Sequence, residues 1–223
     1  PELLRRLDLQ GCLVTIDAMG CQVDIAELIV EKKGDYLFSL KGNQSNLHED
    51  VSLLFDDLEA SGFSAYVHDY HKTVDKDHGR IEVRHCWTIS DPQLIQHLRG
   101  ADRFANLQTL VRVRSERYLG DDHSVEERHY IGSATTQAAE ALRATRIHWQ
   151  VENSLHWVLD IAFREDESRL RKGNGPQNFA VLRHIALNAL KQEKSTKLGV
   201  KNKRLKAGWD EAYLLKVLGH ITD

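Results

Sequence analysis

The chain has 223 residues, of which 41% are hydrophobic and 28% are charged, an ordinary composition for a globular protein of one or two domains. Its formal net charge is −3 at pH 7, and no segment approaches the roughly 20 apolar residues of a membrane-spanning helix, which excludes such a helix. The three cysteines (Cys12, Cys21 and Cys86) show no metal-ligand spacing and indicate free thiols in a reducing compartment.

Charge is distributed unevenly along the chain. Residues 164–206 contain twelve Lys or Arg and four Asp or Glu, a local net charge of +8, which leaves −11 for the remainder. A basic segment of this density favours a polyanionic partner. A solvated helical face without a ligand is the open alternative.

The first elements along the chain are typical of a strand–helix–strand unit. Residues 1–7 resemble the last part of a helix, so we expect preceding chain and a fragment or processed product. Residues 11–19 form an apolar run that predicts a buried strand, 24–34 have helical spacing, and 35–42 predict a second strand. Two strands joined by a helix within about 30 residues predict a right-handed βαβ unit with parallel strands.

The middle of the chain changes from helical to β-rich patterning. Residues 46–60 predict an amphipathic helix, and 91–98 predict a short helix with Pro92 in its first turn. Between about residues 63 and 132 the sequence alternates polar with β-branched residues, which predicts strands. The expected strands are 80–90, 107–118 and 124–133.

The last third of the chain is predicted to be helical. Thr135 or Thr136 is expected to cap a helix over 137–163 that breaks near Thr145. A second helix is predicted over 176–194. Its expected apolar face is Phe179, Leu182, Ile185, Ala186, Ala189 and Leu190. A basic connector (194–208) and a terminal helix (209–220) are expected to follow.

The stretch RIHWQVENSLHWVLD, residues 146–160, concentrates polar side chains on one predicted helix. On an α-helix His148, Glu152 and His156 are spaced i, i+4 and i+8, so they line one face, with Asp160 a turn further. A carboxylate held in this way suits a hard cation such as Mg²⁺. A solvent-facing polar stripe is an open alternative, and a zinc site is another, although zinc usually takes four ligands.

A second candidate carboxylate, Asp17, ends the apolar run LVTID. The carboxyl ends of parallel strands form the edge where sites assemble, and burial of a lone Asp there would require a partner or a cation. It could instead cap the following turn. Asp17 on a strand and Glu152 on a helix would suit phosphoryl transfer with two Mg²⁺ ions. Such a site needs a third carboxylate, for which Asp24, Asp160 or a residue upstream of the chain are possible.

Three motifs carry a resemblance to a known family. The segments VTIDAMGCQ, YLFSLKGNQ and RIHWQVENSLHWVLDIAFREDESRLRKGN resemble bacterial insertion-sequence transposases of the DDE class, of the H-repeat-associated kind, and the resemblance covers essentially the whole chain. It implies an α/β fold with a partial RNase H-like catalytic core, whose N-terminal strands are missing, and a β-rich insertion before the last catalytic helix. The implied domains are 1–45 (partial core), 46–135 (helix plus insertion) and 136–223 (catalytic helix and basic helical region).

The resemblance also implies roles for single residues. Asp17 matches the second Asp of the catalytic triad and Glu152 matches its Glu, and both would bind Mg²⁺ or Mn²⁺. The first Asp lies on an earlier strand that this chain lacks. Asn153 and Asp160 would support the Glu. In the family, a Tyr, an Arg and a Lys around the Glu contact DNA phosphates. Here these positions hold Thr145, His148 and Leu159. We therefore expect Arg146, His148 and His156 to contact DNA in their place.

Further DNA contacts are expected from basic residues after the catalytic helix and from the end of the second strand. These candidates are Arg164, Arg169, Arg171, Lys172 and Arg183, together with Lys41 and Asn43, although Lys41 could be an ordinary solvent lysine. The implied activity is Mg²⁺-dependent cleavage and strand transfer at insertion-element ends, by a homo-oligomer assembled on DNA in the bacterial cytoplasm at the nucleoid. The alternative is an inactive DNA-binding remnant that lacks the first Asp, so enzymatic activity is an open question here.

Overall fold

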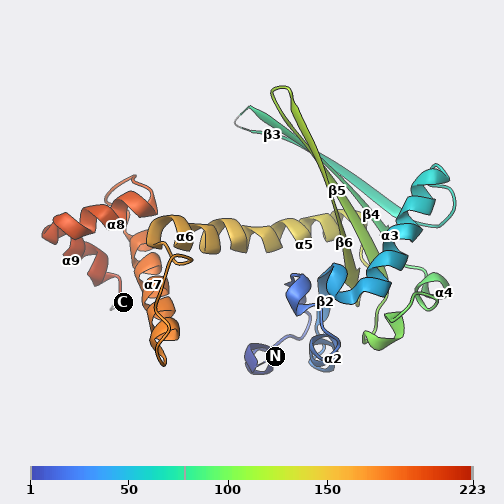
Figure 1. Cartoon of the computed structure of the whole chain (residues 1–223), viewed down its shortest axis with the longest axis horizontal. Coiled ribbons are helices and arrows are strands. Elements are labelled where there is room, and N and C mark those ends of the chain that lie inside the picture. The colour runs from blue at the N-terminus through green and yellow to red at the C-terminus, as the bar shows by residue number, and fades with distance from the viewer. Residues whose placement is uncertain (1, 78, 222–223) are drawn as a thin grey trace. The chain divides into compact units, whose positions relative to one another are not determined.

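The computed structural model describes residues 2–77 and 79–221, except for the side chains of Glu152 and Asn153. The chain folds into a mixed α/β structure with two compact units, Pro1–His148 and Trp149–Asp223 (Figure 1). Each unit has a hydrophobic core of its own. The three-part division expected from the sequence stays a prediction.

The first unit is built on one six-stranded sheet with the strand order β1-β2-β6-β5-β4-β3. Its strands are β1 (Leu13–Ile16), β2 (Asp35–Leu40), β3 (Asp69–Asp77), β4 (Arg80–Ile89), β5 (Thr109–Leu119) and β6 (Asp122–Gly132). β1 and β2 are parallel and are joined through α2 (Val23–Glu31), which confirms the predicted βαβ unit. The other neighbours are antiparallel, and Figure 1 shows the hairpins β3–β4 and β5–β6 as long arms.

The predicted strands of the middle segment are confirmed as β4, β5 and β6, but β3 was missed. Its sequence, DYHKTVDKD, is mostly polar, and its residues alternate only between exposed and half-buried. β3 is an outer strand of the sheet. Natural sheets use charged side chains on such strands to prevent edge-to-edge association, which removes the hydrophobic alternation that predicts a strand.

The two faces of the sheet are covered by different helices. On one face Phe38 and its cross-strand neighbours pack against α2 and against Val51 and Phe55 of α3 (Ser45–Ala60). On the other face Leu37 packs in a cluster with Leu142 of α5 (Ala138–Val151). Because successive side chains of a strand point to opposite faces, adjacent residues of β2 enter two separate cores.

The N-terminus of α5 is held by a residue that the sequence did not indicate. The expected caps, Thr135 and Thr136, direct their hydroxyl groups to Gln108 and to the Ala134 carbonyl. The backbone N–H of Ala138 instead donates to the Asp69 carboxylate at 2.9 Å. A strand residue distant in sequence therefore supplies the acceptor that the first turn of the helix needs.

The shorter elements agree with the sequence. α1 (Glu2–Arg6) is a short helix, and α4 (Pro92–Ile95) has Pro92 in its first turn, as predicted, although the helix is shorter than the expected 91–98; the Asp91 side chain caps it. The cysteines Cys12, Cys21 and Cys86 are free thiols, also as predicted. In the part of the chain that the structure describes, no helix has the length and apolar content needed to cross a bilayer.

A π-helical turn, η4 (Glu152–His156), follows α5 and precedes α6 (Trp157–Phe163). The predicted helix over 137–163 is therefore interrupted here and not near Thr145, which is buried in α5. A π-helical turn has i→i+5 hydrogen bonding, so the regular i, i+4 register expected between Glu152 and His156 is broken.

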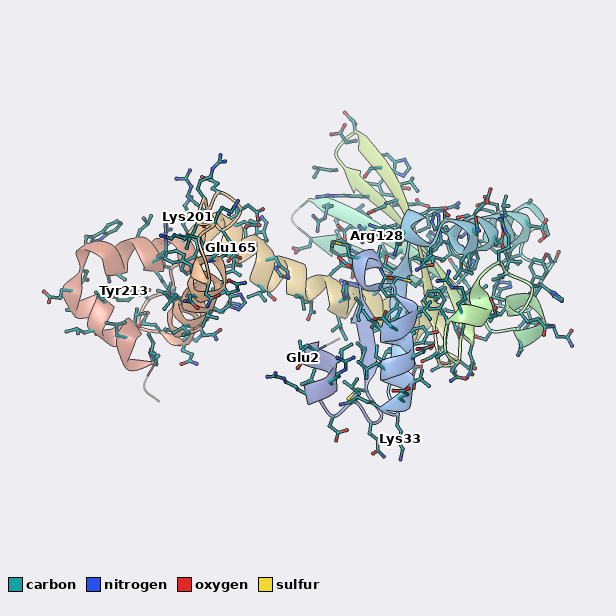
Figure 2. All side chains as sticks on the ribbon, turned by 60° about the horizontal axis from the view of Figure 1, so that its bottom comes forward. Glu2, Lys33, Arg128, Glu165, Lys201 and Tyr213 are labelled. Carbon is teal, nitrogen blue, oxygen red and sulfur yellow. The ribbon has the colours of Figure 1, made fainter. Side chains whose placement is uncertain are left out.

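The second unit consists of helices. After α6 these are α7 (Gly175–Gln192), α8 (Val200–Trp209) and α9 (Glu211–Gly219). Its core joins Leu190 of α7 with Tyr213 and Val217 of α9, and Figure 2 shows Tyr213 among these helices. The segment predicted as a basic connector contains α8, which packs Val200 and Ala207 against this core.

The predicted apolar face of α7 is wrong in its first half. Phe179 and Leu182 are 48% and 58% exposed, whereas Leu187 and Leu190 are buried. Only the C-terminal half of the helix enters the core. Spacing alone identified an amphipathic helix but could not show how much of its length the neighbouring helices cover.

Candidate functional site

Asp17 directly follows β1 at the carboxyl end of the parallel strand pair. Its side chain is exposed, and one carboxylate oxygen, Oδ1, accepts a hydrogen bond from the backbone N–H of Met19 at 3.0 Å. It thereby caps the 3₁₀ turn η1 (Ala18–Gly20), as the capping interpretation predicts. The expected burial is wrong, so the cost of burying a charge gives no reason for a partner here.

Lys41 and Asn43 lie where β2 ends, beside the end of β1. The Asn43 amide donates to the Ala18 carbonyl at 2.6 Å and so supports the turn that Asp17 caps. Lys41 is exposed and precedes the 3₁₀ turn η2 (Gly42–Gln44). The two strand ends thus bring one carboxylate, one amide and one ammonium group to the same edge of the sheet.

His148, near the end of α5, contacts β1. Its Nδ1 lies 3.2 Å from Oγ1 of Thr15, and both side chains are half-buried. Thr15 and Asp17 are two residues apart, so they lie on the same side of the strand. His148, expected at first to grip DNA, therefore has a contact within the protein, next to the strand that leads to Asp17.

Arg146 also has a partner within the first unit. Its Nη1 donates to the Asp75 carboxylate of β3 at 2.7 Å, and Arg84 of β4 donates to the same carboxylate at 2.6 Å. The Arg146 side chain is 47% exposed. This ion pair links α5 to the β3–β4 hairpin. To bind a DNA phosphate, Arg146 would have to break its ion pair with Asp75 or contact both groups at once.

The remaining residues of the predicted site lie on the second unit. The backbones of Glu152 and Asn153 belong to η4, but their side chains lie outside what the structure describes. His156 is exposed and Asp160 is half-buried in α6. Within the described residues, no group of three or more His, Cys, Asp or Glu side chains forms a metal-binding cluster.

The basic residues that follow α6 fall into two classes. Four of them are exposed, namely Arg164, Arg169, Arg171 and Lys172; among these, Arg164 is paired with Glu167 and Arg171 donates to two nearby backbone carbonyls. Arg183, expected to touch DNA, is only 9% exposed and pairs with Glu165 at 3.1 Å. The expectation for Arg183 is therefore wrong, because its guanidinium stabilises the helical unit from inside.

The two units differ in formal charge. Residues 1–148 contain 24 acidic and 17 basic residues, a net charge of −7, and residues 149–223 contain nine acidic and 13 basic residues, a net charge of +4. Both units have exposed lysines: Figure 2 labels Lys33, between α2 and β2 in the first unit, and Lys201 of α8 in the second unit. The second unit is thus the better electrostatic match for a polyanion.

Thr15 is the site residue that sequence reasoning missed. Its position two residues before Asp17 was a signal, because alternate strand residues share a face. Nothing in the local pattern indicated that the face would meet the helix ending near residue 151.

Comparison with known proteins establishes the family. The family described as "Transposase DDE domain" matches residues 1–189, most of the chain. The chain belongs to this family of transposases. The resemblance seen in the three sequence motifs is thereby confirmed, and the mixed α/β structure agrees with it.

Relatives match over the whole chain. It is 40% identical over 227 residues to "Putative transposase YncI" of Escherichia coli O157:H7, covering 100% of this chain and 57% of that protein. It is 38% identical over 222 residues to "H repeat-associated putative transposase YhhI" of Escherichia coli (strain K12), covering 98% of this chain and 57% of that protein. The chain therefore spans little more than half the length of these relatives. No solved structure gives a significant match.

Proposed function

We propose that this chain is part of the catalytic region of a transposase that cuts DNA at the ends of an insertion element and joins those ends to new DNA. The observation on which the proposal depends is the position of Asp17, an exposed carboxylate at the carboxyl end of a parallel strand pair, in a chain of the DDE transposase family. In open α/β sheets this edge is the usual place for a site.

We further propose that β1, α2 and β2 belong to an RNase H-like core in which Asp17 and Glu152 are catalytic carboxylates. The donor chemistry of Asp17 fits Mg²⁺ or Mn²⁺, because the side chain is exposed and carboxylate oxygens are the ligands such ions prefer. When bound, the metal would activate a water or a 3′-hydroxyl and stabilise the leaving oxygen. Met19 N–H and Asn43, which brace the η1 turn, would hold the Asp17 carboxylate in a fixed direction.

The backbone at Glu152 supports a functional assignment. Glu152 begins the π-helical turn η4, and single π-helical turns inside helices occur frequently at functional sites. One α-helical turn earlier in the sequence, His148 is fastened to Thr15. We propose that Asn153 and Asp160 support the Glu152 carboxylate.

DNA would be held through its phosphates. The exposed basic residues Arg169 and Lys172 are the strongest candidates, since their charges are on the basic second unit. The further candidates are Lys41, Asn43, Arg146, His148, His156, Arg164 and Arg171. We propose that the protein acts as a homo-oligomer assembled on element ends, in the bacterial cytoplasm at the nucleoid.

The test uses a full-length transposase that contains this chain, because the chain spans 57% of its relatives. Asp17→Asn and Glu152→Gln are expected to lower Mg²⁺-dependent cleavage of element-end DNA more than about 100-fold, since each removes a metal ligand. Glu27→Gln, at an exposed carboxylate of α2 that has no proposed role in the site, is the matched control and should retain activity. Full activity in both site variants would refute the proposal.

The alternative function, DNA binding without turnover, predicts a different result. The full-length protein would bind DNA with an affinity that falls linearly with salt on logarithmic axes, and it would not cleave DNA with Mg²⁺ or Mn²⁺. Replacing Arg169 and Lys172 by Gln should then reduce the salt dependence, by about one unit of slope for each phosphate that is no longer neutralised. Cleavage that depends on Asp17 would exclude this alternative.

A further inference from the structure

The first unit contains an aromatic pocket that the proposed catalytic function does not use. It has a volume of about 490 Å³ and lies on the sheet face that α3 covers. Its walls come from α3, from the loop after α3, and from β3, β4 and β5. Arg112, Arg114 and Glu116 are alternate residues of β5, so all three point toward this face.

Four rings form the apolar part of the pocket. The Trp87 ring is nearly parallel to Phe63, at 5.4 Å and 4°, and to His85, at 5.7 Å and 11° between their planes. Tyr70 lies 5.3 Å from Trp87, and its hydroxyl is 2.8 Å from Nδ1 of His85. Trp87 is 5% exposed but Tyr70 is 44% exposed, so the Tyr70 ring offers surface to a ligand.

The carboxylates of Glu59 and Glu116, together with Arg114 and His68, complete the lining. Hydrogen bonds from Arg114 lower the pKa of Glu59, and the hydrogen bond from the Tyr118 hydroxyl lowers the pKa of Glu116. Burial lowers the pKa of His85, which favours the neutral imidazole. The lining therefore carries the negative charges of Glu59 and Glu116 and the positive charge of Arg114.

The two carboxylates differ in how their charges are matched. Arg114 donates to both oxygens of Glu59 at 2.7 and 2.8 Å, and the buried Arg112 lies 3.1 Å from the same group. Glu116 accepts a hydrogen bond from the Tyr118 hydroxyl at 2.6 Å, and its carboxylate lies 3.7 Å from Nε2 of His85 and 4.0 Å from Nε2 of His123. Glu59 is in direct contact with two arginines, so its charge is matched more fully than that of Glu116, which is the carboxylate better able to pair with a cation.

We propose that this pocket binds a guanidinium cation, from a free small molecule or from an arginine side chain, stacked on the Tyr70 ring and paired with the Glu116 carboxylate. A guanidinium group is planar, so it stacks on aromatic rings, and its N–H groups match the two oxygens of a carboxylate. A cation over the face of an aromatic ring is attracted by the ring's quadrupole. This site is independent of the proposed catalytic function.

The test measures binding by calorimetry with this chain alone. Butylguanidinium is expected to bind saturably, and butylurea, which has nearly the same shape without the charge, is expected not to bind. A parallel titration uses N-acetylarginine methylamide, which presents the arginine side chain on a peptide backbone. Comparing its binding with that of butylguanidinium tests whether the natural ligand is an arginine side chain or a free small cation. Glu116→Gln should weaken butylguanidinium binding at least about ten-fold, because it removes a charge-assisted hydrogen bond.

Glu126→Gln is the matched control. Glu126 of β6 is paired with Ser115 of β5, which precedes Glu116. Adjacent strand residues point to opposite faces, so Glu126 lies on the face of the β5–β6 hairpin away from the pocket. The Glu126→Gln substitution should therefore leave binding unchanged. Tyr70→Leu provides a second variant if Glu116→Gln does not fold, as judged by circular dichroism, and should also weaken binding. Equal weakening by both Gln variants, equal binding of butylurea, or no binding would overturn the proposal. Binding of adenosine in place of butylguanidinium would also overturn it and would indicate a nucleobase pocket.

Discussion

His148 and Thr15 lie 133 residues apart in sequence, and their side chains meet in a hydrogen bond of 3.2 Å between Nδ1 and Oγ1. Both side chains are half-buried. The bond fastens the C-terminal part of α5 to β1, the strand that ends immediately before Asp17.

Thr15→Val removes this hydrogen bond while conserving the side-chain shape. We expect the free energy of unfolding to fall by about 1 kcal/mol, the usual net value of one hydrogen bond. Urea unfolding measures the change. Thr73→Val is the control, because the Thr73 hydroxyl is buried without a hydrogen-bond partner among the described residues. This variant should be neutral or slightly more stable, and an equal decrease in both variants would contradict the assignment.

Asp69→Ala removes the acceptor for the Ala138 N–H at the start of α5. Loss of an N-terminal cap costs about 0.5–2 kcal/mol, so we expect a decrease of this size in the free energy of unfolding. Faster hydrogen exchange in the first turn of α5 would locate the effect. Thr136→Ala should have little effect there, because its hydroxyl donates to the Ala134 carbonyl. The reverse order of the two variants would show that Thr136 is the cap.

Gly20→Ala should disturb the turn that Asp17 caps. A Cβ at position 20 would lie 2.2 Å from Cγ2 of Ile16, which cannot be accommodated without movement of strand or turn. We expect a loss of about 1–3 kcal/mol in the free energy of unfolding, the usual range for overpacking. Gly42→Ala is the control, since a Cβ there meets no atom within 4 Å. If thermal unfolding shows no difference between the two variants, the close contact at Ile16 is not real.

His129 makes the first unit sensitive to mild acid. Burial, aided by the nearby His48, lowers its pKa from 6.5 to about 4. As the pH falls from 6.5 to 4, the unfolded chain takes up a proton at this histidine that the folded chain does not. The free energy of unfolding therefore decreases as the pH falls across this window, by up to about 3 kcal/mol. His129→Gln should flatten this dependence in urea unfolding, whereas His97→Gln, at an exposed position, should not. An unchanged slope in His129→Gln would contradict the prediction.

Glu193 makes the second unit sensitive to stronger acid. Hydrogen bonds from Ser195 and from the Tyr213 hydroxyl lower its pKa from 4.5 to about 2. Because the folded pKa lies below the unfolded value, its contribution is present above pH 4.5 and is lost as the pH falls toward 2. Glu193→Gln should remove this pH dependence, followed by circular dichroism of the helices. Glu211→Gln, an exposed position on α9, should leave it intact, and equal behaviour of the two would refute the role of Glu193.

The sequence by itself determined the family and the local elements of this protein. The βαβ unit was predictable because apolar runs and helical spacing report directly on which residues can be buried together. The position of Asp17 after β1 followed from the same pattern, and its cap on the next turn was one of the two interpretations it allowed. The catalytic role of Asp17 and Glu152 stays a prediction that rests on the motifs and the family.

Only the tertiary structure decided which distant residues meet. The acceptor for α5 is Asp69, the partner of Arg146 is Asp75, and the contact of His148 is Thr15. Arg183 proved to be buried, although the segment that contains it is rich in basic residues. Hydrophobic spacing reports the burial of a whole element, whereas hydrogen bonds and ion pairs depend on the approach of two elements, which no local pattern encodes.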